Sequence, residues 1–134
     1  MSIEENKKVV TQLMEMHGER TTADLVASDF INHVNEKMGV EALQSIGSAI
    51  RETFPDFVVE IEDVIAEDDK VVVRRTLRGT HQGSALPLVE GIPPTGKPVG
   101  WHFIHIFRLR DGKIVEHWAR RDDLEVRRSL GASE

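Results

Sequence analysis

The residues most capable of chemistry gather near the carboxyl end of the chain, around a predicted hairpin turn at Asp111-Gly112. Aspartate followed by glycine between two alternating segments is typical of a two-residue turn joining antiparallel strands. If this turn alone sets the register, His105 lies opposite Trp118, and side chains alternate between the two faces of both strands. One face then holds Trp101, Phe103, His105, Phe107, Ile114, Trp118 and Asp122, although a bulge would shift part of this set.

Asp122 and His105 are the two groups on this predicted face that could move protons. Apolar surroundings raise the pKa of an enclosed carboxyl group, which makes it a useful general acid or base near neutral pH. A nearby imidazole can donate a hydrogen bond to a developing enolate oxygen. The pair could remove a proton next to a carbonyl without a metal or a cofactor. Asp122 also stands where it could cap the terminal helix, and the two roles do not exclude each other.

Two further patterns fall short of a ligand site. The segment 91–98 approaches a phosphate-binding loop, but it lacks Ser or Thr after Lys97, and its two prolines remove backbone donors. His102 and His105 are three residues apart on a predicted strand, so they point to opposite faces and do not easily share an ion. We therefore expect neither a bound nucleotide nor a metal, and no cofactor.

The elements that position the hairpin follow from hydrophobic periodicity. Ser2 and Glu5 have capping-box spacing and predict the start of a helix that ends near Gly18. The further predicted elements are a short helical turn over 21–26, an extended segment over 29–34, a helix over 39–53, strands over 57–62, 71–80, 101–109 and 113–122, and a helix over 123–130. Helices followed by an antiparallel meander indicate an α+β fold, in which a curled sheet can leave a cavity against the helices.

Length and composition limit the classes of protein that remain. The 134 residues suit a single domain, 1–134, and the absence of cysteine excludes a disulfide or a cysteine nucleophile. Basic residues number 17 and acidic residues 23, a net charge of 17 − 23 = −6, so we expect no nucleic acid or anionic membrane as partner. We see no signal peptide and no apolar run long enough to span a bilayer, and we expect a cytoplasmic location.

Several short motifs resemble those of one family. They are Asp29-Phe30-x-x-His33, Phe54-Pro55-Asp56, Gly79-Thr80-His81-Gln82-Gly83, the segment from Gly91 to Lys97, the segment from Asp111 to Trp118 followed by Asp122, and Leu130-Gly131. In order and spacing they resemble the SnoaL-like polyketide cyclases, also called ester cyclases, of the nuclear-transport-factor-2-like superfamily. The resemblance covers nearly the whole chain and is more specific for the fold than for the reaction.

The resemblance implies a cone-shaped, curved antiparallel sheet packed against about three helices and enclosing a pocket, in a homodimer formed through the sheet. It implies a cofactor-free cyclase that closes a ring by intramolecular aldol condensation. Asp122 matches the family's general acid/base and His105 its supporting histidine. The expected substrate-binding residues are His33, Trp101, Phe103, Trp118 and Arg120.

The chain departs from the family where many relatives carry an acidic residue, directly after the His-Trp pair, because Ala119 stands there. Arg120 and Arg121 follow in place of apolar or small residues. Such arginines could form a cationic rim that binds an acidic substrate, or they could face solvent.

Three classes of function remain open at this point. The first is a lyase or isomerase acting on a hydrophobic carbonyl compound, within which epoxide hydrolysis would need more than one enclosed carboxylate. The second is a protein that binds a small apolar ligand without chemistry. The third is an interaction domain, which would leave the polar members of the aromatic face without a role.

Overall fold

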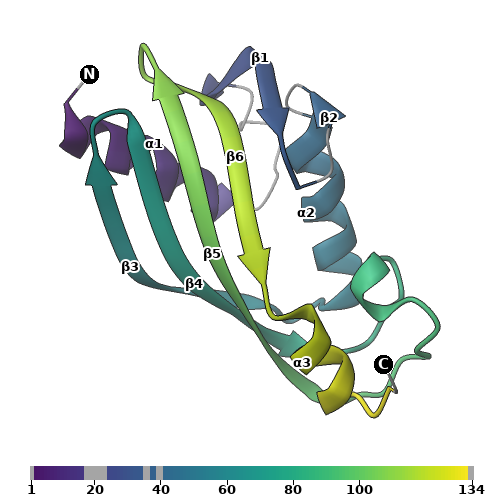
Figure 1. Cartoon of the computed structure of the whole chain (residues 1–134). Helices are drawn as coiled ribbons and strands as arrows, with labels where there is room; N and C mark the ends of the chain where they lie inside the picture. Colours follow the sequence, from purple (N-terminus) through teal and green to yellow (C-terminus); the bar gives the residue numbers. More distant parts are fainter. Residues whose placement is uncertain (1, 17–23, 35–36, 39–40, 133–134) are drawn as a thin grey trace.

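A computed structural model describes residues 2–16, 24–34, 37–38 and 41–132. In these residues three α-helices pack against a curved sheet (Figure 1). The elements in chain order are α1 (Ile3–Met16), β1 (Val26–Asn32), β2 (Lys37–Met38), α2 (Glu41–Thr53), β3 (Val58–Glu67), β4 (Lys70–Thr80), the 3₁₀ turn η2 (Pro87–Val89), β5 (Pro98–Arg110), β6 (Lys113–Arg121) and α3 (Asp123–Ser129).

The sheet has the strand order β2-β1-β6-β5-β4-β3. Strands β3 to β6 form the predicted antiparallel meander, which confirms the α+β class. The expectation of a wholly antiparallel sheet is wrong, because β1 runs parallel to β6. Parallel pairing is possible here because a long stretch of chain, including α2, separates the two strands. Within the described residues β2 and β3 remain edge strands that do not pair with each other, so the sheet is curved but not closed.

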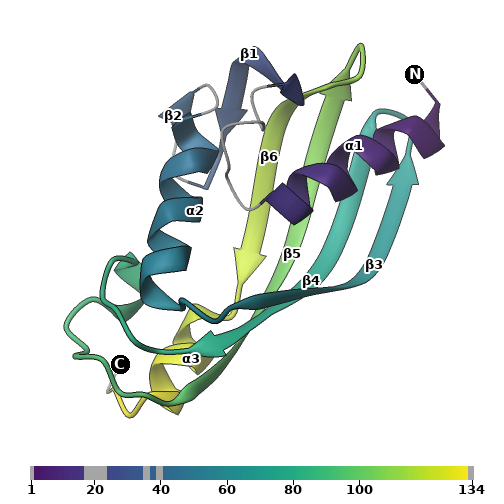
Figure 2. The same ribbon diagram turned by 180° about the vertical axis from the view of Figure 1, so that it is seen from behind.

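Helices α1 and α2 cover one face of the sheet, as the view from behind shows (Figure 2). Helix α3 lies with η2 at one end of the sheet, beside β5. The opposite face of the sheet carries no helix in the described part of the chain. None of the described helices combines the length and the apolar character needed to cross a bilayer.

The amino-terminal helix begins as its sequence predicts. The backbone N–H of Glu5 donates to Ser2 Oγ at 3.1 Å, and Ser2 Oγ donates to Glu5 Oε1 at 2.9 Å, which is the reciprocal capping box. The predicted end of this helix at Gly18 lies outside the described residues. The helical turn predicted over 21–26 is wrong at Val26, which begins β1, while residues 21–23 lie outside the described part.

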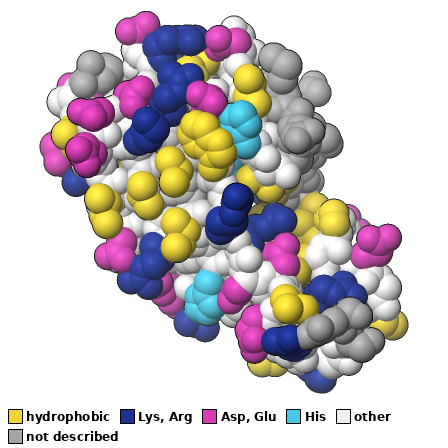
Figure 3. Space-filling view, viewed as in Figure 1, with side chains coloured by type: hydrophobic (Ala, Val, Ile, Leu, Met, Phe, Trp, Pro, Cys, Tyr) yellow, Lys and Arg dark blue, Asp and Glu magenta, His cyan; other side chains and the backbone are white. Residues whose placement is uncertain are grey.

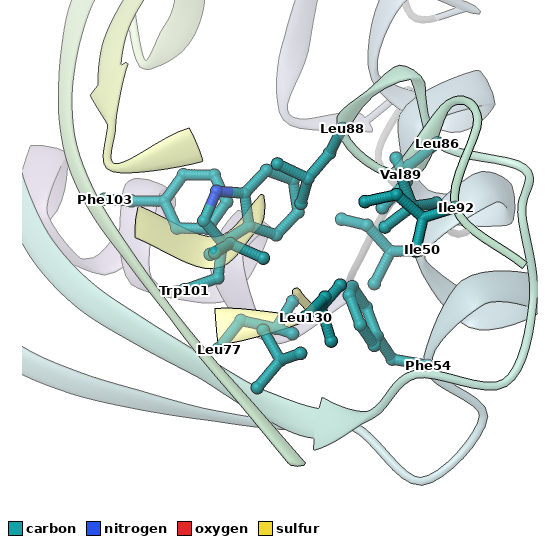
Figure 4. Packing of buried hydrophobic residues seen from close by; sticks show 12 residues of the cluster. Ile50, Phe54, Leu77, Leu86, Leu88, Val89, Ile92, Trp101, Phe103 and Leu130 are labelled. Atoms are coloured by element: carbon teal, nitrogen blue, oxygen red, sulfur yellow. The ribbon is translucent and has the colours of Figure 1, made fainter. Parts of the chain in front are cut away.

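Two buried apolar clusters flank the middle of the sheet. One gathers around Phe54 and Trp101, whose ring centroids are 6.4 Å apart, and joins α2, the loop around η2, β5 and α3 (Figure 4). The other gathers around Phe30 and Phe107 and joins α1, β1 and β4 to β6. The concave strip between the clusters is where the candidate site lies.

The β5–β6 hairpin has the predicted turn but not the predicted register. Asp111 and Gly112 both have positive φ, 51° and 77°, as a two-residue type I′ turn requires. Leu109 pairs with Ile114 as expected, but the register then shifts, because Val115 is an extra residue on β6. Beyond this bulge the observed pairs are Phe107 with His117, His105 with Ala119 and Phe103 with Arg121. A one-residue shift reverses the facing of every later side chain on that strand.

Candidate functional site

A cavity of about 80 Å³ lies between the concave face of the sheet and the helices α1 and α2. A single buried water needs roughly 10–15 Å³ of such space, so the cavity can hold several waters or a small organic group. Most of its wall is apolar and comes from Leu13, Met14, Ile46, Ile50, Phe57, Leu77, Trp101, Phe103 and Phe107. The charged or hydrogen-bonding side chains of the wall are Asn32, Arg75, His105, His117 and Arg121, with no carboxylate among the described lining residues.

Strand alternation brings these polar groups to the same face. On β4 the buried side chains Val71, Val73, Arg75 and Leu77 are two residues apart, so an arginine occupies a position of the apolar face. The antiparallel partner strand contributes His105.

The β6 bulge and the edge strand supply the remaining polar groups. Beyond the bulge His117 turns inward and pairs with Phe107. On the other side of β6, the parallel strand β1 places Asn32 beside His117.

Four of these side chains form one hydrogen-bonded chain along the cavity wall. Arg75 Nε donates to His105 Nε2 at 2.8 Å. His105 Nδ1 and His117 Nε2 are 2.7 Å apart, and His117 Nδ1 and Asn32 Oδ1 are 3.0 Å apart. An arginine N–H can only donate, so the Nε2 atom of His105 must accept. Each imidazole is then neutral with its proton on Nδ1, and the whole chain of donors runs from Arg75 to Asn32.

The amide of Asn32 ends the chain with an unused donor. Its Oδ1 atom accepts from His117 and also from the backbone N–H of Val34 at 3.0 Å, which fixes the orientation of the amide. The Nδ2 atom is fully buried and has no hydrogen-bond partner among the described residues. A buried donor without a partner costs about 1–3 kcal/mol. An oxygen of a ligand in the cavity would satisfy it.

The electrostatics of the wall keep both histidines neutral at pH 7. Burial lowers the pKa of His105 well below its ordinary value, and the positive charge of Arg75 lowers it further. Burial likewise lowers the pKa of His117 from 6.5 to about 3, again with a contribution from Arg75. Burial also lowers the pKa of Arg75 to about 10, so this guanidinium remains charged at pH 7. A neutral imidazole is an available proton acceptor, although a weak one while its pKa stays low.

The two arginines of the wall differ in their surroundings. Arg75 is only 7% exposed, and its guanidinium carbon lies 4.7 Å from the centroid of the Phe103 ring. Arg121 is partly exposed, lies over the Trp101 ring at 5.5 Å and pairs with Asp123 at 3.2 Å. Arg121 therefore has a carboxylate partner, whereas Arg75 has none among the described residues.

Three of the seven predicted site residues line the cavity, namely Trp101, Phe103 and His105. His33, Trp118, Arg120 and Asp122 are not among its lining residues. The expectation that Trp118 and Asp122 share the face of His105 is wrong, because the bulge at Val115 reverses β6 from Glu116 onward.

His33 and Trp118, which lie outside the cavity, pack against each other. The rings of His33 and Trp118 stack at 4.9 Å, and His33 Nε2 lies 2.8 Å from Glu116 Oε2 on a partly exposed surface. The neighbour of His33, Asn32, is the residue that reaches the cavity. Arg120 is exposed and donates to the backbone oxygen of Ala119 at 3.0 Å.

Asp122 stands at the N-cap position of α3, as one of its two predicted roles requires, but its side chain makes no capping hydrogen bond. Instead Asp122 Oδ1 accepts from the backbone N–H of His102 at 2.9 Å. This orientation, away from the cavity, gives no support to the predicted acid/base role, which stays a prediction.

The sequence held two signals for the residues that were missed. Ile114 and Val115 are adjacent apolar residues, a break in strict alternation that indicates a bulge. The alternation from Val71 to Leu77 already places Arg75 on the apolar face. No local signal identifies Asn32, because its place depends on pairing with β6.

Comparisons with known proteins point to one family. The sequence matches the family described as SnoaL-like polyketide cyclase over residues 4–130. It is 28% identical over 116 residues to the aklanonic acid methyl ester cyclase DauD of Streptomyces sp. strain C5, covering 81% of this chain and 69% of DauD.

Two solved structures extend this similarity to the fold. AclR of Streptomyces galilaeus, a proposed hydroxylase, is 26% identical with a TM-score of 0.83, over 99% of this chain and 89% of AclR. IdmH of Streptomyces antibioticus, a proposed polyketide cyclase, is 28% identical with a TM-score of 0.77, over 95% of this chain and 99% of IdmH. The match over nearly the full length, on a curved sheet with a cavity beneath its helices, shows that the chain belongs to the SnoaL-like polyketide cyclase family.

Proposed function

We propose that this protein is a cofactor-independent lyase or isomerase that removes a proton next to a carbonyl group of a hydrophobic substrate. The observation that carries the proposal is the chain Arg75–His105–His117–Asn32 inside an apolar cavity. The membership in a family of cyclases supports the same class of reaction. The relative DauD is named a cyclase, and an intramolecular aldol closure is the ring-forming version of this chemistry that we propose.

The proposed base is the Nε2 atom of His105. It holds a lone pair, faces the cavity and becomes available when the guanidinium of Arg75 moves from it. As Nε2 takes the substrate proton, the positive charge can spread along the chain, because the Nδ1 proton of His105 can pass to His117 Nε2 at 2.7 Å. The largely apolar wall lowers the local dielectric constant, which strengthens each of these interactions.

Two donors remain for the oxygens of the substrate. They are the guanidinium of Arg75 at one end of the chain and the Nδ2 atom of Asn32 at the other. Once Arg75 has moved from His105, these two donors can stabilise a developing enolate oxygen. Epoxide hydrolysis receives no support, because no carboxylate lines the described cavity.

Deuterium exchange tests this proposal without knowledge of the natural substrate. In D₂O we expect the protein to accelerate exchange at the carbon next to the carbonyl of β-tetralone, followed by proton NMR. His105→Gln should lower the exchange rate by about 10²–10⁴-fold, the usual contribution of a positioned acid or base. His102→Gln is the matched control, since His102 lies on the opposite face and contacts Thr76. Equal rates for the wild type and His105→Gln would exclude His105 as the base.

The second candidate is a protein that binds its ligand without chemistry. One observation favours it: in the described structure all four ring nitrogens of His105 and His117 are engaged within the chain. This candidate predicts that β-tetralone binds, with a perturbed Trp101 fluorescence, but that its exchange rate stays at the uncatalysed value.

We also propose a homodimer formed through the open face of the sheet. Figure 3 shows hydrophobic side chains gathered among basic and acidic ones on this face, and its exposed members include Ile65 on β3 and Ile104 on β5. Exposed apolar patches of this kind mark interaction surfaces. Ile104→Arg should convert a dimer to a monomer in sedimentation velocity, and an unchanged sedimentation coefficient would refute this interface.

A further inference from the structure

Arg75 differs from three arginines of the outer face, Arg74, Arg78 and Arg108, in having no acidic partner among the described residues. Arg74, Arg78 and Arg108 each lie within 3.3 Å of a glutamate or aspartate oxygen. For Arg75 the only described hydrogen bond is with a neutral imidazole, and its other contact is the face of Phe103. Its side chain is buried, so its charge is balanced neither by a described carboxylate nor by free access to water.

A buried charge without a partner is less favourable than a buried charge that is paired and hydrogen-bonded. The other cation of the wall, Arg121, already has Asp123 as its partner. The unused Nδ2 donor of Asn32 adds a second group that seeks an acceptor. Both groups, the Arg75 guanidinium and Asn32 Nδ2, are therefore hydrogen-bond donors that would bind a negatively charged or electron-rich oxygen.

We infer that the ligand of this cavity is an acid bound as its anion: a compact, apolar carbonyl compound whose carboxylate pairs with Arg75. A guanidinium binds a carboxylate through two parallel hydrogen bonds, which are stronger than a hydrogen bond to a neutral ring nitrogen. In the proposed geometry the ligand's carboxylate binds the edge of the guanidinium that includes Nε, and so it displaces His105 from Arg75. Asn32 Nδ2 remains as a donor for another oxygen of the same ligand.

Through this exchange of partners, ligand binding increases the basicity of His105 Nε2. In the described structure Arg75 Nε donates to His105 Nε2, and the charge of Arg75 disfavours protonation of the imidazole. A carboxylate on Arg75 frees this nitrogen and balances that charge, so His105 becomes a stronger proton acceptor when an acid is bound. A neutral ketone, ester or amide competes less well for Arg75, so it should react more slowly than an acid of the same shape. The inference takes from the proposed function that this cavity is the substrate site and that His105 is its base, and the anion site itself depends only on the first.

The test compares benzoate with benzamide, which has nearly the same shape but no charge, by isothermal titration calorimetry at pH 7. We expect benzoate to bind roughly 10–100-fold more tightly, as a charge-assisted, buried hydrogen-bonded pair provides. Arg75→Met should remove this preference. Arg74→Met should retain it, since the neighbouring arginine faces the opposite side and pairs with Asp63 at 2.7 Å.

Two results would overturn the inference: equal affinities for benzoate and benzamide, or failure of benzoate to bind to the wild-type protein. Retention of the preference in Arg75→Met would overturn it as well. If Arg75→Met does not fold, Arg75→Lys replaces it, and this variant should keep a reduced preference because it keeps the charge but not the paired geometry. A full preference in Arg75→Lys would contradict bidentate binding.

The binding test and the exchange test can give opposite outcomes, and each outcome removes only one of the two proposals. A benzoate preference together with unaffected exchange in His105→Gln would remove the proposed base and keep the anion site. Exchange that depends on His105, without a benzoate preference, would keep the reaction and remove the anion site.

Discussion

Arg74 and Arg75 are neighbours on β4 that point to opposite faces of the sheet, and they differ in exposure and in hydrogen-bond partners. Arg74 is half-exposed and pairs with two carboxylates, those of Glu62 and Asp63. Arg75 is buried among aromatic rings, and a neutral histidine is its described hydrogen-bond partner. The histidines of β5 repeat the contrast, since His102 is exposed and contacts Thr76, whereas His105 is buried.

The difference separates charged side chains that pair with one another from polar side chains that lack a full set of protein partners. On the outer face Arg74, Arg78 and Arg108 have carboxylate partners, and each such surface pair contributes at most about 1 kcal/mol. On the inner face the Nδ2 atom of Asn32 has no hydrogen-bond partner and Arg75 has no carboxylate among the described residues, at a cost in stability. Strain or unmet hydrogen bonding of this kind marks functional positions. The comparison can be tested on the two faces in turn.

The largest expected effect concerns packing on the inner face. Phe107 is fully buried, so Phe107→Ala should lower the free energy of unfolding by about 3–5 kcal/mol through lost burial and a new cavity. Val58→Ala, at an exposed position of β3, should change it by no more than about 0.5 kcal/mol. Urea denaturation followed by circular dichroism measures both. Similar losses in the free energy of unfolding at the two positions would mean that the two faces of the sheet do not differ in their contribution to packing.

Acidification is the next largest effect. His117 has a pKa of about 3 in the folded protein, against 6.5 ordinarily, and the pKa of His105 is also lowered. Between these values the unfolded chain binds more protons than the folded one, so stability falls as the pH drops below 6.5. Each neutral buried histidine should cost up to about 1.4 kcal/mol per pH unit.

Urea midpoints at a series of pH values check this effect. The variant His117→Gln should show a shallower loss of stability with acidification, whereas His102→Gln should show the loss of the wild type. A wild-type stability that does not change across this pH window would mean that the two buried histidines are not neutral.

A smaller effect is expected from adding the acid that the cavity wall lacks. Ala119 lines the cavity and pairs with His105 across the hairpin. Ala119→Asp should supply Arg75 with an internal anion, raise the pKa of His105 and weaken benzoate binding by roughly tenfold. Arg120→Asp, one residue further on the outer face, is the control and should leave benzoate binding unchanged. Stronger benzoate binding in Ala119→Asp would contradict an anion site.

Local patterns predicted the elements better than they predicted the site. Three features depend on contacts between residues close in the sequence, so the sequence shows them directly. They are the capping box at Ser2, the hydrophobic periodicity of α2 and the Asp111-Gly112 turn. Trp101, Phe103 and His105 were placed correctly because they precede the turn on an uninterrupted strand.

The residues beyond the turn were misplaced for a physical reason. A single extra residue, Val115, reversed the facing of the remainder of β6, which removed Trp118 and Asp122 from the predicted face and brought in His117. The contact between His117 and Asn32 joins residues 85 positions apart. Such a contact depends on the parallel pairing of β1 with β6, which no local pattern specifies.

Nitrogen NMR of the imidazole rings tests the central claim most directly. In the ligand-free protein both His105 and His117 should be neutral and protonated on Nδ1, with His117 remaining so until the pH approaches its pKa of about 3. Addition of benzoate, but not of benzamide, should raise the pKa of His105 and leave the signals of His102 unchanged. Ring nitrogens of His105 and His117 that titrate near 6.5 without ligand, and do not respond to benzoate, would contradict the account.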